Sequence, residues 1–171
     1  MSKHLIFVYG TLLRGLENSH RLQKAAFKGA AVTCDQFYMV SNENNGIPTE
    51  NSYEPSEKLE PQDPYKYPYL MKQSISERQG DPSQIIGEVY EVDSDTLAEL
   101  DVLEEHPTVY RRQAIAVLPT GDIEEVISET QMIEGYVLEN EEVIQDLRSN
   151  MDSGRYRIVT GGSWAAYVKQ N

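Results

Sequence analysis

Short apolar runs separated by turn residues dominate the chain and predict mostly β structure. Runs of this length, bounded by Gly, Pro, Asn or Asp, are typical of buried strands. The expected strands are Leu5–Tyr9, Val32–Val40, Ile85–Val92, Tyr110–Leu118 and Val126–Leu138, with Tyr67–Met71 as a further apolar segment. Because the helices between them are few and short, we expect an α+β fold with a mixed sheet or small β-barrel.

Helix signals occur in three stretches. The expected helices run from Asn18 or Ser19 through Ala26, from Asp93 to His106, and from Asn140 to Ser149. The middle helix has the clearest signals, because capping residues precede it and Pro107 follows it.

The character of the chain changes between Ser41 and Lys66. This stretch is acidic, rich in Asn and Pro, and poor in aliphatic residues. We therefore expect a surface insertion at about 41–66 rather than a second domain. A length of 171 residues suits one domain, so we expect a single domain over 1–171.

Glu104 is placed on an apolar stripe of the expected middle helix. At about 100° per residue, Leu97, Leu100 and Glu104 fall on one face, whereas Glu105 points elsewhere. A carboxylate among leucines is costly unless it has partners or a function, and desolvation raises its pKa toward neutrality. The pattern therefore makes Glu104 a candidate general acid or base. The alternative is a side chain that reaches water at the helix end.

The loop between Gly10 and Gly15 follows the first expected strand. Its spacing resembles a phosphate-binding loop, but Leu16 and Glu17 stand where Lys and Ser or Thr are needed, so nucleotide binding is disfavoured. The backbone N–H groups of such a loop can bind a carboxylate or a developing oxyanion. An ordinary tight turn is the alternative reading.

Composition excludes several classes of function. The formal net charge of −13 argues against binding to nucleic acid or to an anionic membrane. No apolar run is long enough to span a membrane, and the first run is too short for a signal-peptide core. The single cysteine, Cys34, rules out an internal disulfide framework. We therefore expect a cytoplasmic protein.

Several familiar catalytic motifs are absent from the sequence. There is no G-x-S-x-G element and no dinucleotide fingerprint after a strand. His4, His20 and His106 lack metal-ligand spacing. We therefore expect no metal, no cofactor and no covalent intermediate.

Four motifs resemble the γ-glutamyl cyclotransferase-like superfamily, which includes γ-glutamylamine cyclotransferases and plant AIG2-like proteins. The segment from Val8 to Gly15 is similar to the N-terminal signature of that superfamily. The other three elements are Gly87–Val92, Leu100–Glu104 with the following Pro107 and Tyr110-Arg111-Arg112, and Gly161-Gly162-Ser163-Trp164. They resemble its central strand, its catalytic segment and its closing Gly-x-Trp element, in the same order.

The resemblance implies a fold, a reaction and a set of site residues. The fold would be a small mixed β-barrel with surrounding helices. The reaction would release an amine from a small γ-glutamyl substrate while the glutamyl group closes to 5-oxoproline, with Glu104 as the proton shuttle. The substrate-binding residues would be Tyr9, Gly10, Thr11, Leu12 and Tyr110.

Two alternatives remain open beside this reading. The chain could be a non-catalytic binding module for a small molecule or a protein, or an acidic scaffold that uses residues 41–66 to bind a partner. The leaving amine also stays open, among a γ-glutamyl-lysine crosslink, a γ-glutamyl amino acid and a γ-glutamyl group that protects a metabolite. The oligomeric state is open as well.

Overall fold

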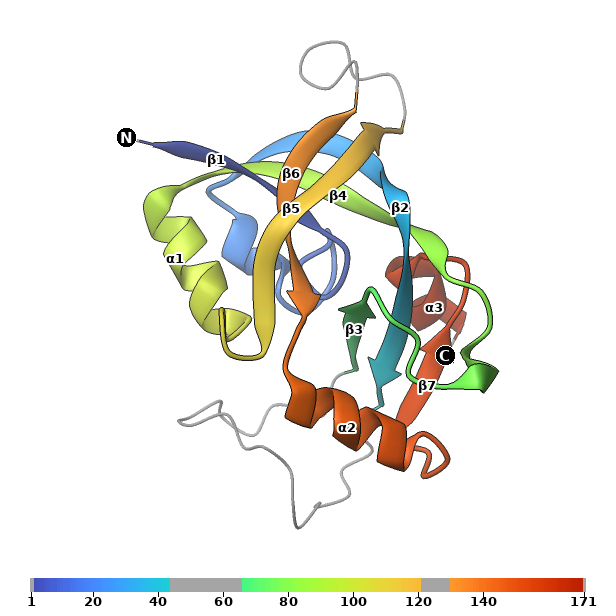
Figure 1. Ribbon diagram of the computed structural model, residues 1–171. Helices are drawn as coiled ribbons and strands as arrows, with labels where there is room; N and C mark the ends of the chain where they lie inside the picture. Colours follow the sequence, from blue (N-terminus) through green and yellow to red (C-terminus); the bar gives the residue numbers. More distant parts are fainter. Residues whose placement is uncertain (1, 44–65, 121–129, 171) are drawn as a thin grey trace.

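The computed structural model describes residues 2–43, 66–120 and 130–170 (Figure 1). Its strands are β1 (Lys3–Val8), β2 (Ala26–Asn42), β3 (Tyr67–Met71), β4 (Ser83–Asp93), β5 (Tyr110–Pro119), β6 (Gln131–Leu138) and β7 (Tyr156–Val159). Its helices are α1 (Ser94–Leu103), α2 (Glu141–Asn150) and α3 (Trp164–Gln170), with short 3-10 helices η1 (Ser19–Leu22) and η2 (Glu77–Gln79).

Five strands close into a barrel. They follow one another in the order β2, β4, β1, β6, β5, and β5 pairs in turn with β2. The β1–β6 pairing is parallel, whereas the other pairings are antiparallel. The expected α+β fold, a small mixed barrel with a few surrounding helices, is therefore confirmed.

The long strand β2 belongs to two sheets. Its first part pairs with β4 and β5 in the barrel. Its last residues pair with β3 on one side, from Tyr38 to Asn42, and with β7 on the other, from Met39 to Asn42. The register of β2 against β4 shifts at two places. Such bulges bend a strand locally. The expected strand Val32–Val40 was too short, since β2 also includes the residues from Ala26 to Ala31 at one end and Ser41 and Asn42 at the other.

Helix α1 ends earlier than the sequence suggested. Glu104 is its C-cap and Glu105 takes a positive φ of 51°, so the helix does not reach His106. The N–H of His106 donates to the Asp101 carbonyl at 2.9 Å, and the N–H of Glu105 donates to the Val102 carbonyl at 3.2 Å. These two bonds form a Schellman motif, in which a left-handed residue replaces the usual glycine.

Two other sequence expectations need revision. The expected helix through Ala26 is a four-residue 3-10 helix, Ser19–Leu22, and Ala26 already belongs to β2. Ser41 and Asn42 belong to β2 rather than to the expected insertion, and residues 44–65 lie outside the described residues. The expected strand Val126–Leu138 is described from residue 130 onward and contains β6.

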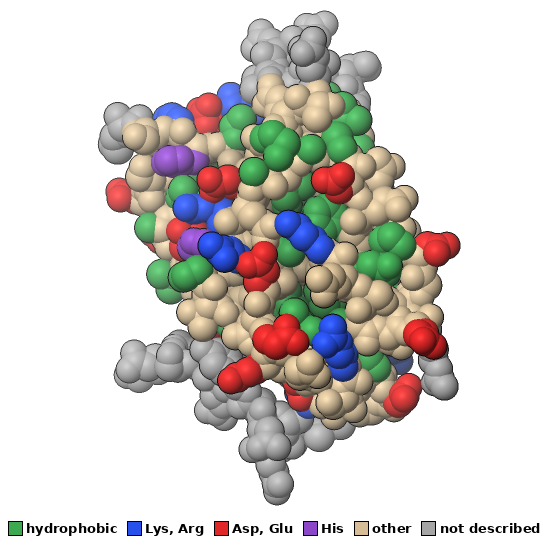
Figure 2. Space-filling view, in the orientation of Figure 1, with side chains coloured by type: hydrophobic (Ala, Val, Ile, Leu, Met, Phe, Trp, Pro, Cys, Tyr) green, Lys and Arg blue, Asp and Glu red, His purple; other side chains and the backbone are tan. Residues whose placement is uncertain are grey.

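The surface and the helices add two observations. Acidic and basic side chains alternate on the face seen in Figure 2, so neither sign forms a separate patch there. Among the described residues, no helix combines the length and apolar character needed to cross a bilayer.

Candidate active site

The segment from Tyr9 to Leu12, which we call the substrate loop, follows directly after β1. All four of its residues are buried. A hydrogen bond of 3.0 Å from the N–H of Leu13 to the Gly10 carbonyl turns the chain, and one of 2.9 Å from the N–H of Asn18 to the Thr11 carbonyl closes the loop. The barrel therefore fixes the start of the loop, and the return of the chain at Asn18 fixes its end.

The substrate loop has backbone donors to spare. Within the part of the chain that the structure describes, the N–H groups from Tyr9 through Leu12 donate no hydrogen bond. Buried N–H groups without an acceptor are rare in proteins, because each is costly to leave unpaired. Successive free N–H groups in a turn can bind an anion or stabilise a developing oxyanion.

Pro68 of β3 packs against Gly10. A Cβ atom built on Gly10 would lie 2.7 Å from Cγ of Pro68 and 3.1 Å from its Cδ. The carbonyl of Pro68 accepts a 2.8 Å hydrogen bond from the hydroxyl of Tyr110. Gly10 is thus required by packing within the protein, and Pro68 links the substrate loop to Tyr110.

Helix α1 carries Glu104 toward the substrate loop. The helix starts after Asp93, which pairs with Lys3 at the beginning of β1, and it packs against β1 and β4. A helix of this length spans about 15 Å and a strand like β1 about 20 Å. Running back along the barrel, α1 therefore ends near the end of β1, where the substrate loop begins.

Glu104 stays on the apolar stripe although it lies just beyond α1. Its N–H donates to the Leu100 carbonyl at 2.9 Å, so it continues the helical hydrogen-bond pattern. Leu97 and Leu100 on the same stripe are buried. The backbone at Glu104 therefore continues the helical path of Leu97 and Leu100, even though the helix ends at Leu103.

Burial and two nearby charges set the pKa of the Glu104 carboxyl. Burial raises the pKa of Glu104 to about 7, Arg21 opposes the rise, and Glu105 adds to it. A carboxyl with a pKa near neutrality can both accept and return a proton. Glu104 therefore has the proton affinity that general acid–base catalysis needs.

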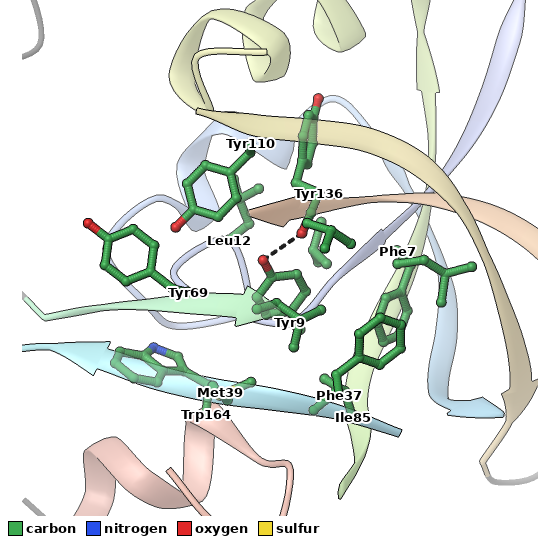
Figure 3. Packing of buried hydrophobic residues seen from close by; sticks show 14 of the residues in the cluster. Phe7, Tyr9, Leu12, Phe37, Met39, Tyr69, Ile85, Tyr110, Tyr136 and Trp164 are labelled. Carbon is green, nitrogen blue, oxygen red and sulfur yellow. Dashed lines mark hydrogen bonds between the residues drawn. The ribbon is translucent and has the colours of Figure 1, made fainter. Parts of the chain in front are cut away.

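Tyr9 and Tyr110 lie within the electrostatic range of Glu104. Burial first, and then the Glu104 charge, raise the pKa of Tyr9, and burial, Tyr9 and Glu104 raise that of Tyr110. Both hydroxyls therefore stay protonated. The Tyr9 hydroxyl donates to the Tyr136 carbonyl at 2.7 Å (Figure 3). The Tyr110 ring stacks on the Tyr69 ring, with 6.0 Å between the ring centroids.

A charged network ties the end of α1 to the barrel. Arg112 of β5 binds both carboxylate oxygens of Asp101, at 3.0 and 2.9 Å. The hydroxyl of Tyr136 donates to the same carboxylate at 2.7 Å, and the Arg112 N–H donates to Nδ1 of His106 at 3.0 Å. These bonds hold the turn that carries Glu104.

The structure brings together the residues that the sequence suggested. Glu104, Tyr9 and Tyr110 share one electrostatic environment, and Gly10 meets the same proline that binds Tyr110. Sequence reasoning missed Arg21 and Tyr136, which come from η1 and β6. No local motif marks either residue, since only tertiary pairing brings them to the site. Within residues 2–43, 66–120 and 130–170, no three His, Cys, Asp or Glu side chains are grouped to hold a metal ion.

Comparisons with known proteins relate the chain to one family. The family model described as gamma-glutamyl cyclotransferase, AIG2-like, matches residues 6–166. A gamma-glutamylaminecyclotransferase of Mus musculus is 34% identical over 119 residues, which cover 66% of this chain and 62% of the relative. Gamma-glutamylaminecyclotransferase A of Danio rerio is 33% identical over 128 residues, which cover 70% of this chain and 64% of the relative. The chain thus spans less than two thirds of the length of either relative.

A solved structure supports the same relationship. The crystal structure of an AIG2-like protein from Mus musculus matches with a TM-score of 0.57 and 27% sequence identity, covering 83% of this chain and 82% of that one. The matched region of the family model includes the substrate loop, Glu104 and Tyr110.

Proposed function

Since the chain belongs to the gamma-glutamyl cyclotransferase, AIG2-like family, we propose that it releases an amine from a γ-glutamyl amide while the glutamyl group closes to 5-oxoproline. The observation that carries the proposal is the Glu104 carboxyl, whose pKa burial raises to about 7, beside a loop with free N–H groups. The Danio rerio and Mus musculus relatives are named for gamma-glutamylamines, which favours γ-glutamylamines as the substrate class.

The first step is ring closure within one substrate molecule. Ionised Glu104 takes a proton from the α-ammonium group, and the freed amine attacks the γ-carbonyl carbon. A C–N bond forms, and the carbonyl oxygen becomes an oxyanion, which the N–H groups of the substrate loop stabilise. Because both reacting groups belong to the same molecule, correct positioning supplies much of the rate.

The second step expels the amine. The tetrahedral centre collapses, the bond to the leaving nitrogen breaks, and Glu104 returns its proton to that nitrogen. The ring nitrogen gives up its second proton, which the released amine takes up as it becomes an ammonium ion. The products are 5-oxoproline and a free amine, and no covalent bond to the protein forms. The hydroxyls of Tyr9 and Tyr110 stay protonated because burial raises their pKa, so they line the site as neutral groups.

Product analysis with a blocked substrate tests the proposal. The protein is incubated with a γ-glutamylamine and with its Nα-acetyl derivative, and 5-oxoproline and free amine are measured by mass spectrometry. We expect equal amounts of both products from the first substrate and none from the second. Cleavage of the acetylated substrate to N-acetylglutamate would exclude cyclisation. Binding of 5-oxoproline without turnover of any γ-glutamyl amide would favour a non-catalytic binding module.

A further inference from the structure

Arg21 is anchored to the substrate loop through one side chain. Its Nε donates to Oδ1 of Asn18 at 3.4 Å, and Nδ2 of Asn18 donates to the Thr11 hydroxyl at 2.9 Å. Asn18 is buried and Arg21 is partly buried, so the chain of bonds runs from the molecular interior outward. The guanidinium is therefore positioned relative to the loop, although it belongs to a different element, η1.

The guanidinium of Arg21 has no acidic partner among the residues that the structure describes. Five other arginines do have one. Ion pairs with Asp or Glu are formed by Arg111, Arg112, Arg148, Arg155 and Arg157. A partly buried arginine presents a planar fork of donors that matches a carboxylate. Arg21 thus keeps donors available for an anion from outside the chain.

The charge of Arg21 also acts on the proposed proton shuttle. Helix η1 packs against α1, which ends at Glu104. The positive charge of Arg21 lowers the pKa of Glu104 and so opposes the effect of burial. The site therefore holds one carboxyl, one unpaired cation and the free N–H groups of the substrate loop.

A γ-glutamyl group carries its ammonium and its carboxylate on the same α-carbon. A site that places the α-ammonium at Glu104 must offer a nearby cation or N–H donors to the α-carboxylate. We propose that the Arg21 guanidinium binds the α-carboxylate of the substrate, an inference that rests on the proposed cyclotransferase function. Arg21 then selects γ-glutamyl amides over 4-aminobutyryl amides, which close to 2-pyrrolidinone by the same chemistry but lack the carboxylate.

The experiment compares two amides of the same amine. The parent protein, Arg21→Gln and Arg21→Lys are assayed for kcat/KM on a γ-glutamyl amide and on the corresponding 4-aminobutyryl amide. Loss of a charge-assisted hydrogen bond predicts a fall of about 10- to 100-fold for Arg21→Gln on the γ-glutamyl amide only. Arg21→Lys should recover part of that loss, because it restores the charge without the fork.

A binding measurement provides a second readout that needs no turnover. The parent should bind 5-oxoproline more tightly than 2-pyrrolidinone, and Arg21→Gln should lose that preference. Lys24→Gln, which removes an exposed positive charge three residues along the chain, is the matched control and should behave like the parent.

The possible outcomes separate the two proposals. If the parent shows no preference for the carboxylate, or if Arg21→Gln retains it, the assignment of Arg21 is wrong while the proposed function stands. Equal losses of turnover on both amides would also overturn it, because Arg21 would then act only through the charge of Glu104. A parent that neither converts nor binds any γ-glutamyl compound would overturn the proposed function itself.

Discussion

The hydroxyl of Tyr9 donates a 2.7 Å hydrogen bond to the backbone carbonyl of Tyr136. The side chain of Tyr136 in turn donates to Asp101, which Arg112 also binds. One tyrosine of β6 therefore connects the start of the substrate loop with the turn that carries Glu104. The substrate loop and the turn that carries Glu104 are therefore held by the same connection between α1 and the barrel.

Tyr9→Phe should destabilise the protein without unfolding it. The substitution removes one hydrogen bond to a carbonyl in the protein interior, which costs about 1–2 kcal/mol of unfolding free energy. Chemical denaturation of the parent and the variant measures the difference. Tyr110→Phe is a matched control, because it removes the 2.8 Å bond to the Pro68 carbonyl, and a similar cost is expected. If Tyr9→Phe is as stable as the parent, the hydrogen bond between Tyr9 and Tyr136 does not stabilise the fold.

Gly10→Ala should weaken the binding of 5-oxoproline. The added Cβ would lie 2.7 Å from Cγ of Pro68, so the substrate loop or β3 must shift. Overpacking of this kind costs about 1–3 kcal/mol of stability. Adding Pro68→Ala removes the ring atoms that cause the clash, so Gly10→Ala with Pro68→Ala should recover much of the lost affinity. If the double variant binds as weakly as Gly10→Ala alone, the clash is not the cause.

Turnover should follow the ionisation of Glu104. Because burial raises its pKa to about 7, the ionised base becomes populated as the pH rises through neutrality. We expect kcat/KM for a γ-glutamyl amide to increase from pH 5 to pH 8, with a midpoint near pH 7. Steady-state rates across this range provide the test, and a profile that is flat between pH 5 and pH 8 would argue against Glu104 as the base.

The unfolding free energy should also depend on the ionisation of Glu104, but it should fall as the pH rises, whereas turnover increases. A carboxyl whose pKa is raised by folding binds more protons in the native state, so it costs stability as the pH rises from about 4.5 to about 7. Glu104→Gln removes that cost. The variant should match the parent near pH 4 and exceed it by about 3 kcal/mol of unfolding free energy at pH 8. A constant difference at all pH values would contradict the raised pKa.

Much of the fold was predictable from local pattern. Short apolar runs predicted the barrel strands. The capping residues before α1 were read correctly, since Asp93 accepts a 2.7 Å hydrogen bond from the N–H of Thr96. The stop of α1 was misplaced by three residues. A proline signal pointed to His106, whereas the left-handed conformation of Glu105, a residue that seldom adopts it, ends the helix first.

The candidate site was only partly predictable for a related reason. Glu104 lies on a helical stripe and the substrate loop follows a strand, so both leave a mark in the local sequence. Arg21 and Tyr136 reach the site through packing between distant segments, which no local pattern encodes. The packing that requires glycine at position 10 comes from Pro68, 58 residues further along the chain, and no local pattern shows it.

The most direct test of the central claim is 5-oxoproline release by Glu104→Gln, with Glu105→Gln as the matched control. Both variants replace a carboxylate by an amide of the same size, but only Glu104 lies on the stripe with Leu97 and Leu100. We expect Glu104→Gln to lose at least about 10²-fold in kcat, as is typical for a general acid–base group, and Glu105→Gln to change little. Near-parental 5-oxoproline release by purified, folded Glu104→Gln would contradict the assignment of Glu104 as the proton shuttle.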